Sequence, residues 1–334
     1  MKTYGILCFV LAVSMLVCPL LSLDYSSFSF DNVKNAVINN KNEEEALSDD
    51  TATDESGKVV KIKSTAGGNI ISATELDYLI GCVAAEMPAT YHEEAIKAQA
   101  VAAYTNLKRM QKSPDASLGG ADITDSPSTH QGYYDEETQK EKWGEKYEDY
   151  HRKIKAAVTE VFGKTVIYDN EPITAAYSAI CPGRTESAKN IWGGDIPYLQ
   201  SVVSTGDKLS PDYTAETAFT SEQFKEKVSA DKEIALGDDP GTWIGEIKYS
   251  ENNTSVVLSV IIGGKALTGM QVRSLLGLRS PSFQVNFTNG SFIFKNAGYG
   301  HAVGMSQYGA DYMARQGSTY IEILEHYYKG AKVV

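Results

Sequence analysis

The chain has 334 residues and a formal net charge of −12 at pH 7, from 43 acidic and 31 basic side chains. An acidic chain without an evident basic stripe is a poor match to a nucleic-acid-binding protein. Its hydrophobic content of 42% is that of an ordinary globular protein, and its length suits one large domain or two smaller ones.

The first segment has the composition of a membrane-spanning helix. Residues 5–23 form an uncharged run of nineteen residues preceded by Lys2, which can just cross a bilayer and places the N-terminus in the cytoplasm. A cleaved signal peptide is the alternative, but its apolar region is usually shorter and ends in small residues, which are absent around Leu23. We therefore expect a membrane anchor at residues 1–23 and an extracytoplasmic remainder, which would be secreted if the segment were cleaved.

Residues 24–65 predict a disordered acidic tether. The segment is rich in Asn, Ser, Asp and Glu, with acidic clusters at 43–45 and 49–50 and no sustained apolar period. Such a tether would allow an anchored domain to reach a target at some distance from the membrane.

Two helices are expected next. Thr74 followed by Asp77 is typical of a helix start, and Pro88 disfavours helix in the residue before it, so the first helix should end at Glu86. Residues 92–111 are Ala-rich, acidic at their start and basic near their end, which favours a second helix packed against the first.

The remaining pattern indicates an α+β fold in which a smaller insert interrupts the main domain. A loop, a third helix and a hairpin should follow at 113–135, at 151–162 and at 165–179, where the strands 165–168 and 173–179 flank a DNEP turn. The insert should carry a Thr220/Gln223 capping box, strands near 244–249 and 255–262, and a hairpin at Asn289-Gly290; helices at 310–316 and after Thr319 should close the chain. We expect a helical and sheet catalytic core at 66–217 and 296–334, and the α+β insert at 218–295.

Several long motifs resemble those of the stage II sporulation protein D (SpoIID/LytB) family of peptidoglycan-acting proteins. They are AAEMP at 84–88, EAIKAQAVAAY at 94–104, GRTESAKNIWGGDIPYLQSV at 183–202, GYGHAVGMSQYGADYMARQG at 298–317 and ILEHYY at 323–328. The resemblance spans about 70–330 and implies a lytic transglycosylase. Such an enzyme would cleave the MurNAc-β-1,4-GlcNAc bond of peptide-stripped glycan strands to 1,6-anhydro-MurNAc ends, in septal thinning and engulfment during endospore formation.

Glu86 is the expected catalytic residue. It follows Val83, Ala84 and Ala85 at the negative end of an apolar helix, where desolvation and the helix dipole both favour the neutral acid. A carboxylic acid that stays protonated near neutral pH can donate to a leaving glycosidic oxygen.

Hydrolytic glycosidases usually need two carboxyl groups, and the sequence offers one convincing candidate. A single acid/base is sufficient if the attacking group is the C6 hydroxyl of the sugar itself, because intramolecular attack has a large effective molarity. Glu186 is the reserve second carboxylate, and it would favour hydrolysis if it faced Glu86. Its alternative role is to support a helix start.

His301 lies among Gly298, Gly300 and Gly304, which allow the backbone to approach a ligand closely, so we expect it to bind substrate. We expect substitution of His301 or Gln307 by Ala to weaken glycan binding while changing stability by less than about 1 kcal/mol. The other groups expected around the sugars are Gln99, Tyr104, Arg184, Glu186, Trp192, Ser306 and Tyr308.

No metal or other cofactor is expected. Some members of the family carry zinc through a His and two Cys before a Gln-x-Tyr motif, but here the corresponding loop has Thr124 and His130 at the cysteine positions. One imidazole without partners does not make a structural zinc site. Cys82 and Cys181 are the two cysteines outside the N-terminal run, and they could pair.

Two other functions remain open. Related sequences are described as amidase enhancers, so the chain could bind glycan as the non-catalytic partner of an amidase. A hydrolytic muramidase would differ in its product, which would have a reducing end. The expected partners are glycan strands of peptidoglycan, an amidase or endopeptidase of the engulfment machinery, and the cytoplasmic membrane through residues 5–23.

Overall fold

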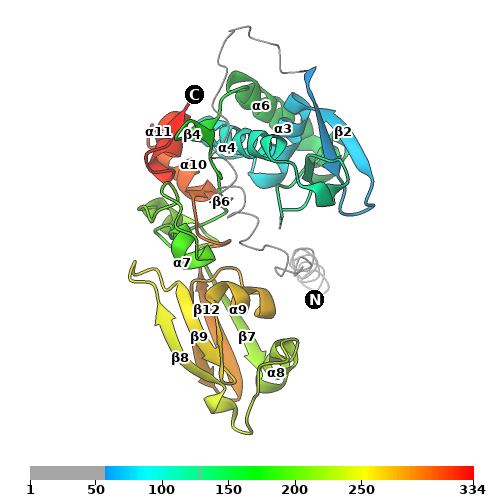
Figure 1. Ribbon diagram of the computed structural model, residues 1–334. Coiled ribbons are helices and arrows are strands. Elements are labelled where there is room, and N and C mark those ends of the chain that lie inside the picture. The colour runs from blue at the N-terminus through cyan, green and yellow to red at the C-terminus, as the bar shows by residue number, and fades with distance from the viewer. Residues whose placement is uncertain (1–56, 128) are drawn as a thin grey trace, which may run out of the picture.

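The computed structural model describes residues 57–127 and 129–334 and shows a mixed α+β fold of two bodies, a mainly helical one and a smaller one of sheets and two helices (Figure 1). The expected anchor at 5–23 lies outside the described residues. Within the described part of the chain, no helix is long and apolar enough to cross a bilayer.

The helical body begins with a small sheet. β1 (Val59–Lys63) pairs antiparallel with β2 (Ile70–Thr74) and parallel with the short β3 (Ile123–Thr124). The tether was expected to extend to residue 65, but the alternation in VVKIK buries Val60 and Ile62 against the helices, and this segment is therefore a strand.

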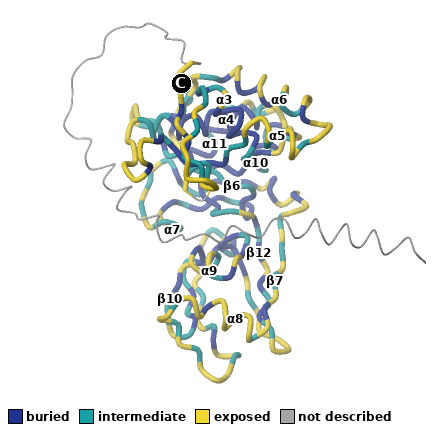
Figure 2. The backbone as a smooth tube through the Cα atoms, turned by 90° about the vertical axis from the view of Figure 1, so that its right-hand side faces the viewer, coloured by how far each residue is buried: buried dark blue, intermediate teal, exposed yellow. Residues whose placement is uncertain are grey.

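α4 (Glu93–Lys112) is the central helix of this body. It contacts α3, α6, α10 and α11, and its alanines let these neighbours approach closely. Figure 2 shows burial concentrated around it and, separately, within the smaller body. The other helices of the body are α3 (Glu75–Glu86), α5 (Glu136–Trp143), α6 (Tyr147–Glu160), α7 (Ala188–Trp192), α10 (Gln307–Arg315) and α11 (Tyr320–Tyr327).

The first two helix predictions are confirmed, including the Thr74 cap and the end at Glu86. The third helix begins at Tyr147, before the expected residue 151, and α5 was missed. α5 is polar almost throughout, with Gln139 as its buried residue, so it carries no apolar stripe for a pattern to detect.

The expected hairpin near residue 170 is shorter than predicted. β4 (Val166–Tyr168) pairs with β5 (Glu171–Pro172) across a two-residue turn, because Asp169 and Asn170 both adopt left-handed backbone angles, with φ of 51° and 61°. The predicted strand at 173–179 is wrong for most of its length. Only Tyr177–Ser178 of that segment form a strand, β6, which pairs parallel with β13 (Met305–Ser306). The last strand, β14 (Lys332–Val333), pairs antiparallel with β4.

The smaller body has its own apolar core between two three-stranded antiparallel sheets and α8 and α9. The rings of Phe224 and Phe292 stack in this core with centroids 4.2 Å apart. The predicted Asn289-Gly290 hairpin and the Thr220/Gln223 capping box are confirmed. Its elements are β7 (Thr214–Thr220), α8 (Ser221–Val228), β8 (Ile244–Tyr249), β9 (Val257–Ile262), β10 (Lys265–Leu267), α9 (Gly269–Leu276), β11 (Phe283–Thr288) and β12 (Ser291–Ala297).

The chain returns to the helical body through a glycine-rich loop. Gly304 has φ of 72°, and a Cβ atom there would lie 2.0 Å from the carbonyl oxygen of Ala176, so this position needs glycine. α10 begins at Gln307, three residues before the expected 310, and α11 has the predicted Thr319/Glu322 capping box. Short 3₁₀ turns complete the fold at η4 (Ala116–Leu118), η5 (Gly144–Lys146), η6 (Thr205–Leu209) and η7 (Pro240–Thr242).

Candidate functional site

Glu86 is the last residue of α3, and Met87 continues the chain in an extended conformation. The carboxyl oxygen Oε1 of Glu86 accepts the N–H of Gly132 at 2.5 Å, and its backbone carbonyl accepts Nε2 of Gln307 at 2.8 Å. The residue is partly exposed. Segments that are distant in the sequence thus meet at the carboxyl group of a partly exposed residue.

The loop that carries Gly132 is anchored to α3 and α4. Gln131 is buried, and its Nε2 donates to the hydroxyl of Tyr78 at 2.9 Å and to the carbonyl of Ala103 at 3.3 Å. The ring of Tyr133 lies so close to Gly81 that a Cβ there would be 2.5 Å from it. These contacts hold the Gly132 N–H in place before any ligand binds.

Tyr177 supports the same carboxyl from the opposite segment. It lies in β6, and its hydroxyl donates to Oε1 of Gln131 at 3.2 Å. The same hydroxyl faces the carboxyl of Glu86 and, by hydrogen bonding, lowers the pKa of that group. Tyr177 therefore couples the loop at 131–132 to the catalytic candidate.

Burial raises the pKa of Glu86 above its usual value, and the hydrogen bonds from Gly132 and Tyr177 partly oppose this rise. Within residues 57–127 and 129–334, no other carboxylate contributes to the shift. Burial also raises the pKa of Cys82 and of Tyr78 well above their usual values. The groups next to Glu86 are thus neutral, which favours the protonated acid.

Partly exposed aromatic rings lie near this position. Tyr308, the residue after Gln307, packs edge-on against Tyr91, with ring centroids 6.1 Å apart. Trp192 packs against His301 with centroids 5.1 Å apart. Both residues are partly exposed, and the sugar contacts expected of them from the sequence stay a prediction.

His301 has a different environment from the one expected. Its Nδ1 accepts the N–H of Val303 at 3.0 Å, and the ring also bonds to the backbone of Tyr177. Burial and the charge of Arg273 lower the pKa of His301 to about 4, so the ring is neutral at neutral pH. His301 therefore supports the segment that carries Tyr177, and its predicted substrate contact stays a prediction.

Gln307, Gln99 and Tyr104 are buried, so the sugar contacts expected of them are not available. Nε2 of Gln307 donates to Oε1 of Gln99 at 3.1 Å in addition to the Glu86 carbonyl. The hydroxyl of Tyr104 donates to Glu75 at 3.0 Å on the far side of α4. Gln307 and Gln99 therefore position Glu86 through its backbone carbonyl. Tyr104 instead links α4 to Glu75 at the start of α3.

Ser306 is likewise structural. It is fully buried, accepts the N–H of Gly309 as the cap of α10, and donates to Oδ1 of Asp207 at 2.5 Å. Asp207 also accepts from Ser204, and burial raises its pKa to about 6. This network fixes the start of α10, from which Gln307 reaches Glu86.

Glu186, the reserve second carboxylate of the sequence analysis, has both oxygens occupied by hydrogen bonds within the protein. It is fully buried, and its carboxylate accepts hydrogen bonds from Asn190 at 2.8 Å, Ser250 at 2.7 Å, Asn252 at 2.9 Å and Thr254 at 3.2 Å. Three of these donors come from the turn between β8 and β9, so Glu186 joins the two bodies. Arg184 lies nearby, in a pocket at the same junction.

The loop at residues 124–130 contains the sequence positions considered for zinc. Thr124 Oγ1 lies 3.1 Å from Nδ1 of His130. Across residues 57–127 and 129–334 there is no group of three or more His, Cys, Asp or Glu side chains placed to hold a metal ion. Cys82 and Cys181 are both buried free thiols, so the possible pairing between them is not formed.

Sequence reasoning missed the contacts made by Gly132, Gln131 and Tyr177. The Gln-x-Tyr motif at 131–133 was a usable signal, but it was considered for zinc alone. Tyr177 lies in a short strand and carries no local pattern of its own.

Comparison with known proteins identifies the family to which this fold and site belong. A family model described as Stage II sporulation protein (SpoIID) matches residues 66–168, which include Glu86, Gln131 and Gly132. Stage II sporulation protein D of Bacillus subtilis (strain 168) is 34% identical over 340 residues, covering 100% of this chain and 96% of that protein. The chain therefore belongs to the stage II sporulation protein D family of sporulation proteins.

Two further relatives extend the comparison. Stage II sporulation protein D of Bacillus amyloliquefaciens is 37% identical over 280 residues, covering 84% of this chain and 79% of that protein. The amidase enhancer of Bacillus subtilis (strain 168) is 29% identical over 302 residues, covering 75% of this chain and 39% of the relative.

The Gln307→Ala variant tests the positioning role of that side chain. Loss of its bonds to Glu86 and Gln99 should lower the free energy of unfolding by about 1–3 kcal/mol, because a buried carbonyl loses its donor. We also expect a lower kcat with little change in KM, measured on isolated glycan strands. Unchanged stability together with a raised KM would instead indicate a direct sugar contact.

Proposed function

We propose that this protein is a lytic transglycosylase that cleaves glycan strands of peptidoglycan, with Glu86 as its single acid/base. The observation that carries the proposal is the environment of this carboxyl. It belongs to a partly exposed residue at the end of a helix, it accepts the N–H of Gly132 and lies beside Tyr177, and burial raises its pKa. Such a group is protonated over a wider pH range than an ordinary glutamic acid.

Glu86 would protonate the bridging oxygen between MurNAc and GlcNAc as the glycosidic bond breaks. The C6 hydroxyl of the same MurNAc then attacks C1, and the Glu86 carboxylate takes the proton released from that hydroxyl. The acid is regenerated, water is not consumed, and the product ends in 1,6-anhydro-MurNAc. Intramolecular attack needs no second carboxylate to activate a nucleophile.

The surroundings of Glu86 support this route over hydrolysis. Glu186, the alternative second carboxylate, is buried with four hydrogen-bond donors on its oxygens. The pKa of Glu86 is raised by burial and not by a neighbouring carboxylate. In a hydrolytic pair, the second carboxyl would need to reach a water beside the same sugar.

Membership of this family supports a role in sporulation, where cleavage would serve septal thinning and engulfment.

We further propose that residues 5–23 anchor the protein in the cytoplasmic membrane with its folded part outside the cytoplasm. The protein would act together with an amidase or endopeptidase on the same peptidoglycan. The relative named amidase enhancer favours a second candidate, a non-catalytic glycan-binding partner of an amidase.

The ends of the products distinguish these functions. Peptide-stripped strands incubated with the protein in ¹⁸O-labelled water should yield unlabelled 1,6-anhydro ends, one water lighter than reducing ends by mass spectrometry. Reducing ends that carry the label would establish a muramidase. Binding without cleavage would establish the non-catalytic candidate.

The pH dependence of cleavage should follow the raised pKa of Glu86. Because the acid must be protonated to donate, the rate should fall as pH rises through that pKa, and this limb should lie above the usual range of a glutamic acid. Tyr177→Phe removes a hydrogen bond that favours the ionised carboxylate of Glu86, so the pKa of Glu86 should rise. The pH at which the cleavage rate falls should therefore rise by as much as about one unit. An unchanged pH profile in Tyr177→Phe would contradict the assignment of Glu86 as the acid.

A further inference from the structure

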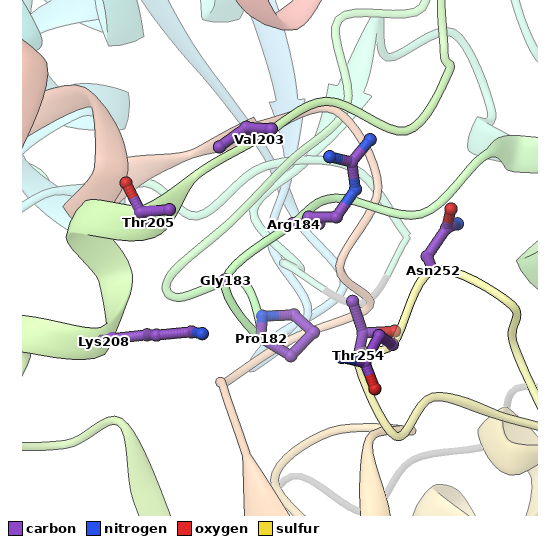
Figure 3. A pocket seen from close by; sticks show the side chains of 9 residues that line it. Pro182, Gly183, Arg184, Val203, Thr205, Lys208, Asn252 and Thr254 are labelled. Atoms are coloured by element: carbon purple, nitrogen blue, oxygen red, sulfur yellow. The ribbon is translucent and has the colours of Figure 1, made fainter.

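A pocket lies where the two bodies meet, apart from the contacts of Glu86. Residues 182–184, Val203, Thr205, Lys208 and residues 252–254 line an open volume of about 320 Å³ (Figure 3). Backbone pairing joins the first two segments, since Arg184 bridges to Val203. The third segment is the turn between β8 and β9.

The charge of this lining is positive. Arg184 and Lys208 are its ionisable side chains, and neither forms an ion pair with a carboxylate in the part of the chain that the structure describes. The chain as a whole has a net charge of −12, so the local sign is opposite to the overall one. Two buried carboxyl groups in adjoining segments already accept hydrogen bonds within the protein: Asp207 from Ser204 and Ser306, and Glu186 from Asn252 and Thr254.

Arg184 is fixed by hydrogen bonds, and exposed Lys208 lies against the backbone of Gly183. Nε of Arg184 donates to Oγ of Ser201 at 3.2 Å, and Nη2 lies 3.5 Å from the Ser201 carbonyl, so one edge of the guanidinium is fixed and its other N–H groups are free of these bonds. Lys208 extends over Gly183, where a Cβ atom would lie 2.6 Å from its Cε, as Figure 3 illustrates. Glycine at 183 makes this path possible.

We propose that this pocket binds a carboxylate of the glycan strand, namely the lactyl carboxylate that MurNAc exposes once its peptide has been removed. The inference rests on the proposed function. Hydrolysis of the amide between the lactyl group and the peptide releases a carboxylate on every second sugar, whereas an intact strand has a neutral, bulky amide there. Arg184 and Lys208 would therefore select stripped strands by charge and by size.

Binding can be measured separately from cleavage. The Glu86→Gln variant is titrated by calorimetry with stripped strands, with the same strands after conversion of their carboxylates to methylamides, and with a glycerol-phosphate polymer. Lys208→Gln and Arg184→Gln are added in that background. Lys225→Gln, an equal change of charge on the exposed face of α8, is the matched control, and thermal unfolding monitors the fold.

We expect free-carboxylate strands to bind about tenfold more tightly than methylamide strands, and each pocket variant to lose about three- to tenfold, because a hydrogen bond to a charged group has this effect in a partly hydrated site. The preference should shrink as salt rises, and Lys225→Gln should change nothing. Equal affinity for the two kinds of strand would overturn the proposal, as would a preference for the phosphate polymer or full retention by a folded Lys208→Gln.

The outcomes also separate this inference from the proposed function. Cleavage of the same strands by the unsubstituted protein is measured in parallel. Cleavage without any preference for the carboxylate would overturn the pocket assignment alone. Carboxylate-dependent binding without cleavage would overturn the lytic activity and support the pocket.

Discussion

Replacement of Glu86 by Gln should lower the rate of strand cleavage by at least the roughly 10²–10⁴-fold that general acid/base catalysis typically contributes. The amide has nearly the same shape and can still accept the N–H of Gly132, but it cannot deliver a proton to the leaving oxygen. Release of anhydro ends from stripped strands, quantified by mass spectrometry, measures the effect.

The fold should survive this change. The carboxyl of Glu86 forms no ion pair within residues 57–127 and 129–334, so the free energy of unfolding should change by no more than about 1 kcal/mol. Glu148→Gln, on the exposed face of α6, is the matched control and should keep full activity. Near-complete activity in Glu86→Gln would move the acid to another residue.

Replacement of Glu186 by Ala should have the opposite effect to Glu86→Gln: it should greatly lower the stability of the fold and leave the rate of glycosidic bond cleavage nearly unchanged. The change leaves the buried donors on Ser250 and Thr254 and the partly buried hydrogen bonds of Asn190 and Asn252 without their acceptor, and it creates a cavity where the two bodies join. We expect the free energy of unfolding, measured in urea, to fall by about 3–5 kcal/mol, because several polar donors lose their acceptor at about 1–3 kcal/mol for each one that stays buried, and a cavity is left behind.

Ser250→Ala is the graded control, because it removes one of these donors and should cost about 1–2 kcal/mol. At a temperature where Glu186→Ala is still folded, its rate per folded molecule should remain within a few fold of the unsubstituted protein. A stable Glu186→Ala that has lost cleavage by orders of magnitude would instead make Glu186 the second carboxylate of a hydrolase.

Local patterns predicted much of the secondary structure because the responsible interactions are short in sequence. The Thr74 cap, the end of α3 before Pro88 and the Asn289-Gly290 turn each depend on residues within four positions of one another. The failures have a matching cause. α5 has no apolar stripe, and β6 exists because β13, more than a hundred residues away, pairs with it.

The candidate site also contains features that the sequence could predict and features that it could not. From the sequence alone, the family motifs and the helix end indicated Glu86 as the acid, since an apolar helix followed by Pro88 is a local feature. The roles of the polar residues around it could not be inferred, because a hydrogen-bonding side chain has the same appearance in a sequence whether it faces a sugar or a backbone. Gln307, His301 and Ser306 were expected to bind substrate, and each is occupied by bonds within the protein.

The sequence by itself determined the family, the helices that frame the acid and the separation of an insert rich in strands, all of which follow from motifs, caps and apolar periodicity. Tertiary structure alone decided the partners of each polar group: Gly132 and Tyr177 on Glu86, four donors on Glu186, and Arg184 beside Lys208 in one pocket. The physical reason is that buried polar groups must find hydrogen-bond partners wherever the fold brings them, and those partners are set by packing and not by spacing along the chain.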